Sequence, residues 1–352
     1  MRIARALVLS VAGMAAATGL LAADGVALAA QPAVPDATTV DTAVDASGRS
    51  IDVSALAQRL RSARHVLLGE LHDDAAQHRL RAAVLKALLA DGRPSWVVFE
   101  QIDREHNAAL AGALRDTEAV VTAGQLDRKA WAWPLHRPLF DAALAAGATV
   151  VGGNLSRAEA GRVVTGGAAR APLALQRWLA APGATSVESP PGWTLEQDAE
   201  LRRQVDEGHC GALPAAMTGP MALAQRARDA ALAAAMMAAP PGARVVLIAG
   251  NGHVRRDIGV PHYLAAAQAG DIVSVGFLER GPDGATRADG PYDEAWFTAP
   301  VDRPDPCASF RPPGAAQQAA AQCTPSSPRP AGDPPMPKPC APLMKQRDAL
   351  GR

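Results

Sequence analysis

Acidic and imidazole side chains follow several short apolar runs of this sequence, and these residue types can bind metal ions or transfer protons. Glu70 and His72 follow the run HVLLG, and Glu100 follows the run WVVF. His253 follows RVVLIA and closes a Gly-Asn-Gly-His turn. Carboxylates and imidazoles together suit a divalent cation or general acid–base catalysis. The pattern predicts a polar site, and it leaves metal binding, catalysis and ligand anchoring open.

Each of these residues also has a purely structural explanation. Glu70 suits a helix N-terminus, where acidic side chains are common, but a glutamate directly after a buried strand is costly to desolvate without a partner. His78 lies six residues after His72 on the next helix, so it either reaches the same site or faces solvent. The glycines beside His253 permit close approach of the backbone. We interpret Glu70, His72, His78, Glu100 and His253 as one polar cluster.

The elements that position this cluster alternate between strands and helices. Five apolar runs predict strands at His65–Gly69, Trp96–Phe99, Thr149–Gly152, Arg244–Ala249 and Ile272–Leu278. Most of the runs are continuous, as in strands buried on both faces of a parallel sheet. Alanine- and leucine-rich stretches predict helices at Asp74–Leu89, Glu105–Arg115, Ser156–Val164, Leu195–Glu207 and Ala222–Ala238. The sequence therefore predicts an α/β fold with a largely parallel central sheet flanked by helices, and the polar cluster falls where its strands end.

The composition and the absence of certain motifs exclude several functions. The 352 residues include 35 basic and 35 acidic side chains, whereas nucleic-acid-binding domains usually carry a basic excess. We therefore expect no nucleic-acid partner. The sequence contains no G-x-S-x-G nucleophile motif, no P-loop and no complete G-x-G-x-x-G motif.

The two ends of the chain differ from its middle. Residues 1–30 combine two arginines, an apolar run and an Ala-Leu-Ala-Ala end, which is typical of a cleaved secretory signal, so we expect a periplasmic or secreted protein. Residues 31–47 are interpreted as a linker and residues 48–300 as the folded body. Residues 301–352 contain 12 of the 29 prolines and are predicted to be a disordered tail. We expect no stable membrane span after cleavage.

The four cysteines matter because an exported protein meets an oxidising environment. Cys210 lies in the body, whereas Cys307, Cys323 and Cys340 lie in the predicted tail. They can form disulfides there, but the pairing cannot be deduced from the sequence.

Five short motifs occur in order along the body, and together they resemble one family. They are GELHDD at 69–74 with His78 after it, VFE at 98–100, HCGALP at 209–214, AQRARD at 224–229, and GNGHVR at 250–255 with GVP at 259–261. This series resembles the ChaN-like haem-binding proteins over about residues 60–280. That family is similar to a wider group with the Tiki-type metalloproteases and erythromycin-esterase-like enzymes, which share a Glu/His cluster on an α/β core.

The resemblance implies a role in haem and iron uptake, with haem (iron protoporphyrin) as cofactor. It also implies a homodimer that holds a stacked pair of haems, an outer-membrane haem receptor system, and tyrosine as iron ligand. The chain has only Tyr263 and Tyr292, and Tyr263 is the preferred ligand because it follows GVPH just beyond the His253 turn. The alternative, that Tyr263 packs at the start of a helix, stays open. His262 beside it would ligate the iron or hydrogen-bond the phenolate. The chain lacks the cysteine that makes some family members lipoproteins, and its Cys/Pro tail has no counterpart.

A second hypothesis stays open on the same residues. Glu70, His72, Glu100 and His253 could surround a divalent metal that activates a water molecule, which would make the protein a metal-dependent hydrolase. An accessible tyrosine beside an apolar slot would favour haem. Convergence of the four side chains within ligand distance would favour the hydrolase.

Overall fold

The computed structural model describes residues 43–308, except 51, 114, 180–191, 268 and 289. The predicted signal segment 1–30, most of the linker and the chain beyond residue 308 lie outside the described residues. Within the described part, no helix combines the length and the apolar character that crossing a membrane requires.

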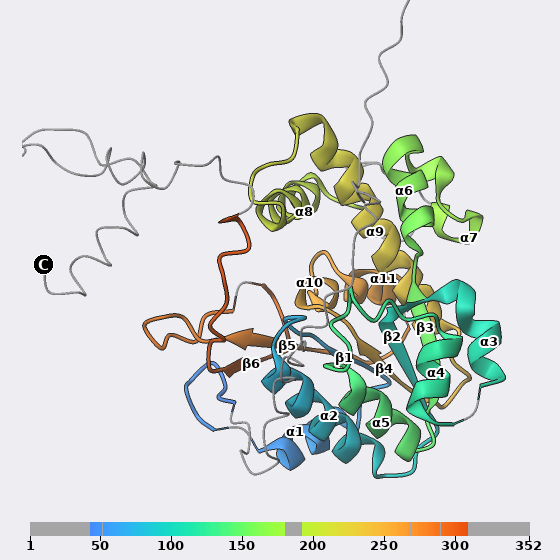
Figure 1. Cartoon of the computed structure of the whole chain (residues 1–352), viewed down its shortest axis with the longest axis vertical. Helices are drawn as coiled ribbons and strands as arrows, with labels where there is room; N and C mark the ends of the chain where they lie inside the picture. The colour runs from blue at the N-terminus through green and yellow to red at the C-terminus, as the bar shows by residue number, and fades with distance from the viewer. Residues whose placement is uncertain are drawn as a thin grey trace, which may run out of the picture. The chain divides into compact units, whose positions relative to one another are not determined.

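A six-stranded parallel sheet forms the centre of the molecule, in the order β3-β2-β4-β1-β5-β6 (Figure 1). The strands are β1 His65–Leu68, β2 Ser95–Asp103, β3 Thr149–Asn154, β4 Arg244–Ile248, β5 Ile272–Glu279 and β6 Glu294–Thr298. The five predicted strands are confirmed. The sequence analysis missed β6 because this short edge strand, EAWFT, has no continuous aliphatic run.

The strands are buried on both faces because helices cover each side of the sheet (Figure 1). Val66 and Leu68 of β1 pack in the core that includes residues of α1, α2 and α5, whereas Leu67 packs in the core that includes residues of α9 and α11. Alternate residues of a strand point to opposite faces, so a continuous apolar run supplies both cores. This confirms the predicted α/β fold.

Most predicted helices are present with small shifts of their ends, except that the helix predicted at Ala222–Ala238 already begins at Ala215. The helices are α1 Val53–Leu60, α2 Ala75–Leu89, α3 Asn107–Ala111, α4 Thr117–Ala123, α5 Arg137–Ala145, α6 Arg157–Gly166, α7 Leu173–Gln176, α8 Leu195–Gly208, α9 Ala215–Met237, α10 Asn251–Val254 and α11 Val260–Ala266, with short 3-10 helices η1 Arg104–His106 and η2 Ala168–Arg170. Asp74 caps α2, because its Oδ1 accepts hydrogen bonds from the backbone N–H groups of Ala76 and Gln77. The helix predicted at Glu105–Arg115 is instead η1 followed by the five-residue α3.

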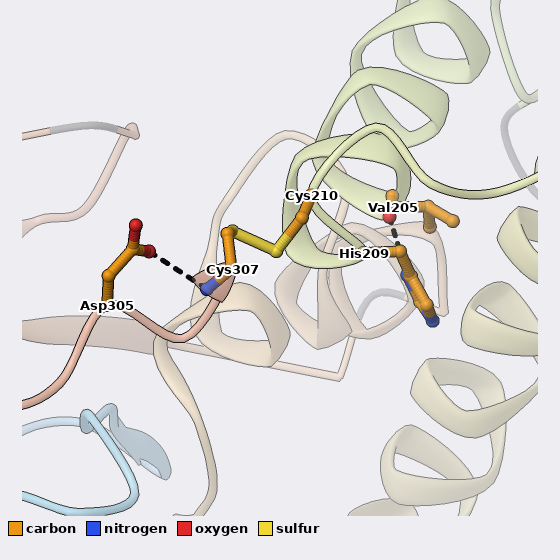
Figure 2. Close-up of a disulfide and its surroundings, with 5 residues drawn as sticks. All are labelled: Val205, His209, Cys210, Asp305 and Cys307. Atoms are coloured by element: carbon orange, nitrogen blue, oxygen red, sulfur yellow. Dashed lines mark hydrogen bonds between the residues drawn. A yellow bond between two sulfur atoms is a disulfide. The ribbon is translucent and has the colours of Figure 1, made fainter. Parts of the chain in front are cut away.

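The first residues of the predicted tail are attached to the folded body. The Arg303 guanidinium donates hydrogen bonds to the carboxylates of Asp73 and Glu279. A disulfide joins Cys307 to Cys210, which follows the C-terminal end of α8 (Figure 2). The body therefore extends past the predicted boundary at residue 300, while Cys323 and Cys340 lie outside the described residues.

Candidate functional site

The predicted polar residues meet at the carboxyl edge of the sheet. Glu70 follows β1, Glu100 lies within β2, and His253 lies on α10 directly after β4. These three strands are neighbours in the sheet, so their ends lie side by side. Glu100 is inside its strand rather than after it, because β2 continues to Asp103 with a register shift after Phe99.

Oxygen Oε1 of the buried Glu70 carboxylate faces three polar side chains. His72 Nδ1 lies 2.8 Å from this oxygen and His136 Nε2 lies 3.1 Å from it. Gln101 Nε2 donates a hydrogen bond to the same oxygen at 3.3 Å. Gln101 therefore supplies a donor to this buried oxygen, and the two imidazoles lie around it.

The second oxygen of the same carboxylate, Oε2, faces two buried basic side chains of α2. His78 Nδ1 lies 3.1 Å away, and the Arg81 guanidinium forms an ion pair with it. His78 therefore reaches the site rather than facing solvent, and Arg81 supplies the charge opposite Glu70. We call Glu70, His72, His78, Arg81 and His136 the Glu70 cluster.

Burial governs protonation in the Glu70 cluster. Desolvation, together with the neighbouring His136, lowers the pKa of His78 to about 4. Desolvation and the charge of Arg81 lower the pKa of His136 to about 3. Desolvation also lowers the pKa of Arg81, to about 9. At neutral pH both histidines are uncharged and Arg81 is the cation beside Glu70.

Backbone carbonyl groups fix how the two neutral histidines face Glu70. His78 Nε2 lies 3.0 Å from the carbonyl oxygen of His72, and His136 Nδ1 lies 3.1 Å from that of Trp131. A carbonyl oxygen only accepts, so each of these nitrogens carries the single N–H of its neutral ring. The other ring nitrogen of each histidine therefore turns a lone pair towards Glu70.

A second buried group adjoins the first and consists of Glu100, Asp229 and His253, which we call the Glu100 triad. His253 Nε2 lies 3.2 Å from Glu100 Oε1, and His253 Nδ1 lies 2.5 Å from Asp229 Oδ1. The N–H of Gly250 donates a hydrogen bond to Glu100 Oε2 at 2.8 Å. One imidazole thus bridges two carboxylates.

This arrangement keeps His253 protonated at neutral pH. Burial alone would lower the pKa of His253, but the charges of Glu100 and Asp229 raise it to about 10. Burial likewise opposes ionisation of Glu100, yet the charge of His253 prevails and lowers the pKa of that carboxyl. Burial raises the pKa of Asp229 to about 6. The triad is therefore an ion pair with a second carboxylate beside it, and its imidazole has no lone pair to offer a metal.

His72 connects the two groups to the surface. Its side chain is half exposed, and its ring lies against the Cα of Gly250, where an added Cβ would come within 2.9 Å of Nε2. Glycine at 250 therefore lets His72 lie in this position, because a side chain there would displace the imidazole. The four residues predicted to surround one metal are thus divided into two pairs, Glu70 with His72 and Glu100 with His253.

Several residues of the site were not predicted as site residues, although each leaves a signal in the sequence. Arg81 lies three residues after His78 on the buried face of α2, and Asp229 is an acid on the alanine-rich buried face of α9. Charged residues on a core-facing helix surface are rare without a partner, so both positions point to one. The only sequence signal at His136 is its unusual context, WAWPLH. Spacing along the chain does not reveal its contact with Glu70, because the two residues are 66 positions apart.

Comparison with known proteins identifies the family. A family model described as "Haem-binding uptake, Tiki superfamily, ChaN" matches residues 56–264. The chain belongs to this family. The matched residues contain the Glu70 cluster, the Glu100 triad and the two α11 residues His262 and Tyr263. A comparison with curated proteins gives no match.

Solved structures with a similar fold include a ChaN protein. The structure titled "Cofacial heme binding to ChaN of Campylobacter jejuni" is 18% identical, with a TM-score of 0.55, and the alignment covers 74% of this chain and 97% of that one. An erythromycin esterase mutant, EreC in its open conformation, is 14% identical with a TM-score of 0.37, covering 71% and 79%. An effector domain of a MARTX toxin from Vibrio vulnificus is 16% identical with a TM-score of 0.34, covering 61% and 34%.

In this ChaN-family chain, the tyrosine predicted to bind iron is buried. Tyr263 is 1% exposed and packs edge-on against Trp178. Its hydroxyl makes no hydrogen bond with the described residues, and burial raises its pKa despite the nearby charge of Arg226. Tyr263 therefore packs in the core in this conformation, because the apolar face of α11 points inwards, and its role as an iron ligand stays a prediction.

His262 lies beside Tyr263 on α11 and is partly covered. Its ring packs edge-on against Trp193, and Gln197 Nε2 lies 3.2 Å from its Nδ1. Desolvation, together with the charge of Arg226, lowers the pKa of His262. Its imidazole is therefore neutral at pH 7, as an iron ligand must be.

Proposed function

We propose that this protein binds haem and acts in haem uptake. The observation that supports this most strongly is the family match over residues 56–264. The matched residues contain the Glu70 cluster, the Glu100 triad, His262 and Tyr263. The C. jejuni relative is described as binding haem cofacially. On this proposal the haem is the cargo, and this chain's side chains hold its propionates and its iron.

The iron ligand proposed for this chain is a tyrosine. Tyr263, supported by His262, remains the first candidate from the sequence, and binding there requires Trp178 and Arg226 to move aside. Tyr292 is partly exposed and lies against Gly276 of β5, so it needs no such opening. We also propose, from the resemblance, that two protomers stack their haems against each other.

Haemin titration followed by absorption spectroscopy tests the proposal. A tyrosinate ligand gives a high-spin charge-transfer band, which should be lost in the Tyr263→Phe variant if Tyr263 is the ligand, and in Tyr292→Phe if Tyr292 is. His262→Ala tests the supporting role, and sedimentation velocity with haemin tests the dimer. No spectral change on adding haemin to the unmodified, folded protein would contradict haem binding.

We also propose that the protein is exported. The support is the composition of residues 1–30 and the Cys210–Cys307 disulfide, since disulfides persist in oxidising compartments. The intact mass of the periplasmic or secreted protein should correspond to a start at Ala30 or Gln31. Retention of residues 1–29 would argue against cleavage.

A metal-dependent hydrolase is the second candidate function, and one observation favours it. Glu70, His72 and His136 offer ligand atoms that lie within 4.8 Å of one another. His136 donates its single N–H from Nδ1 to a backbone carbonyl, as metal-bound histidines do, which leaves the Nε2 lone pair for a metal. Glu70 Oε1 faces the imidazoles of His72 and His136, while Arg81 contacts Oε2. These three residues fit a Zn²⁺-like ion better than the set with Glu100 and His253, because His253 is protonated.

Calorimetric titration with Zn²⁺ and Co²⁺ separates this candidate from haem binding. His136→Ala should lower metal affinity by about 10- to 100-fold or more if His136 is a ligand. His209→Ala is the matched control, because His209 lies at the end of α8 and bonds the carbonyl of Val205 (Figure 2). Equal metal affinity in both variants would exclude a site at Glu70.

A further inference from the structure

A cavity of about 630 Å³ lies among the helices α6, α8 and α9, apart from the carboxyl edge of the sheet. Its size is in the range of small-molecule sites. Most of its lining is small or aliphatic, and three charged residues interrupt it. The lining residues are Val163, Val164, Gly167, Ala168, Leu179, Asp198, Arg202, Ala215, Ala216, Gly219, Pro220, Leu223 and Arg226.

The buried Arg226 makes one wall of this cavity a cationic one. Arg226 is 2% exposed, and its guanidinium stacks over the ring of Trp193 at 4.3 Å. One terminal nitrogen donates a hydrogen bond to the carbonyl of Trp178, but Nε has no hydrogen-bond partner among the described residues. No ion pair within the described part of the chain includes Arg226. Burying a guanidinium group without a carboxylate partner costs free energy unless another anion pairs with it.

Arg202 adds a second guanidinium to the lining. Arg202 Nε donates a hydrogen bond to Asp198, one turn earlier on α8, at 2.5 Å. The guanidinium lies against the Cα of Gly219, where a Cβ would collide with it. Glycine at 219 therefore allows Arg202 to lie close against α9.

Proline interrupts the hydrogen bonding of α9 beside the same space. Pro220 lies within the helix and has no N–H to donate to the carbonyl of Ala216, four residues earlier. The Asp198 carboxylate also lines the cavity and pairs with Arg202, whereas Arg226 has no ionic partner among the described residues. The cavity thus offers two guanidinium groups and one carboxylate among apolar walls, which is the layout of a site for a mostly apolar ligand held by a few polar contacts.

We propose that this cavity binds a carboxylic acid with a large apolar body, with Arg226 and Arg202 binding the carboxylate and the aliphatic walls enclosing the body. Two kinds of molecule share this chemistry, a porphyrin with its propionates and a long-chain fatty acid. The porphyrin case rests on the proposed haem function, whereas the fatty-acid case does not. Arginine suits the role because its planar fork binds carboxylates bidentately.

The test uses metal-free protoporphyrin IX, haemin and palmitate on the full chain. Binding of the porphyrins is followed by quenching of tryptophan fluorescence, and palmitate is tested by direct calorimetry and by displacement of protoporphyrin. Arg226→Met should lower protoporphyrin affinity by at least about tenfold, because a charge-assisted hydrogen bond is lost. Arg226→Lys should retain part of the protoporphyrin affinity, because it keeps the positive charge.

Two further variants keep the result independent of folding defects. Leu223→Trp fills the cavity and should weaken binding similarly without removing a charge. Arg203→Met is the matched control, because Arg203 also lies on α8 but pairs with Glu200 and Glu207 outside the cavity. Circular dichroism confirms the fold of each variant.

The outcomes separate this proposal from the proposed function. Protoporphyrin or palmitate binding that depends on Arg226 and Leu223 supports the cavity, even if haemin gives no iron-ligand band. Protoporphyrin and palmitate binding that both keep their affinity in Arg226→Met and Leu223→Trp overturns the cavity proposal, and haemin binding to the same variants leaves the haem function standing. Failure of both protoporphyrin and palmitate to bind the unmodified protein also overturns it.

Discussion

The carboxyl edge of the sheet and the helical cavity differ in whether their buried charged side chains have ionic partners. At the edge, the Glu70 carboxylate faces Arg81 and three histidines, and His253 lies between two carboxylates. In the cavity, Arg226 is buried with Nε unpartnered among the described residues, beside about 630 Å³ of space. The edge therefore pairs its charges within the protein, whereas the charge of Arg226 has no ionic partner among the described residues.

The difference follows from the elements that build each region. Three adjacent parallel strands hold the edge, and their backbone hydrogen bonds fix the positions of Glu70 and Glu100. The cavity lies among helices whose facing residues include three alanines and two glycines, which leave volume unfilled. Small side chains at a helix interface therefore create the space, and strand ends create the fixed site.

The largest effect we expect is on the fixed region. Glu70→Ala leaves Arg81 buried without its carboxylate, so the free energy of unfolding should fall by about 3–5 kcal/mol. Urea unfolding at pH 7 measures this. The control is Glu118→Ala, which removes two exposed ion pairs with Arg128 and Arg137 and should cost less than about 1 kcal/mol. Similar losses in both variants would show that the edge is not held by this charge pair.

Truncation tests how far the folded body extends towards the C-terminus. A chain ending at Pro300 loses the Arg303 ion pairs and the Cys210–Cys307 disulfide, and should be about 2–5 kcal/mol less stable. A chain ending after Ser309 retains both and should match the full chain in stability and in haem or metal affinity. Denaturant unfolding of the two truncated chains without reductant is the measurement, and equal stabilities would restore a boundary at residue 300.

The decrease in the free energy of unfolding at alkaline pH should depend on the Glu100 triad. The folded pKa of His253, about 10, lies above the value of about 6.5 in an unfolded chain. Its contribution is therefore fully present below pH 6.5 and is lost as the pH rises towards 10, by at least about 1 kcal/mol. His253→Gln should flatten this decline in unfolding experiments from pH 6.5 to 10. An unchanged slope would falsify the protonated state that we assign to His253.

The smallest effect should come from trimming a wall of the cavity. Leu223 faces the cavity and is only partly buried, so Leu223→Ala should cost about 1 kcal/mol or less in the absence of ligand. Leu232 lies on the same helix in the packed core, and Leu232→Ala should cost about 2–5 kcal/mol. Thermal unfolding of both variants compares them directly. Equal costs would mean that the cavity wall is as tightly packed as the core.

Much of the fold could be predicted from the sequence because continuous Val, Ile and Leu runs are physically required of strands buried on both faces. The five strands with such runs were found, and β6 was not, since an edge strand with mixed residues lacks that signal. The α2 start was predicted from Asp74, whose side chain caps the helix. Local chemistry determines these features, so local sequence reveals them.

The site could be predicted only where its residues directly follow strands. Glu70, His72, Glu100 and His253 were found in this way, and His78 by its spacing from His72. His136 was missed because its contact with Glu70 joins elements that sequence spacing does not relate. For Tyr263 the sequence left packing at a helix start and iron ligation open, since the composition of one short helix does not show which of its faces the rest of the chain covers.

The disulfide has a topological consequence for these regions. The Cys210–Cys307 bond closes a covalent ring spanning 97 residues, which contains α9, β4, α10, α11, β5 and β6. Arg226, Asp229 and His253 lie inside this ring, while Glu70 and Glu100 lie outside it. A ring of this size removes about 4–5 kcal/mol of conformational freedom from the unfolded chain in the chain-entropy model. The oxidised unfolded chain therefore keeps the histidine of the triad and the cavity arginine within one tethered loop, and refolding must dock that loop as a unit onto the strands that carry the two glutamates.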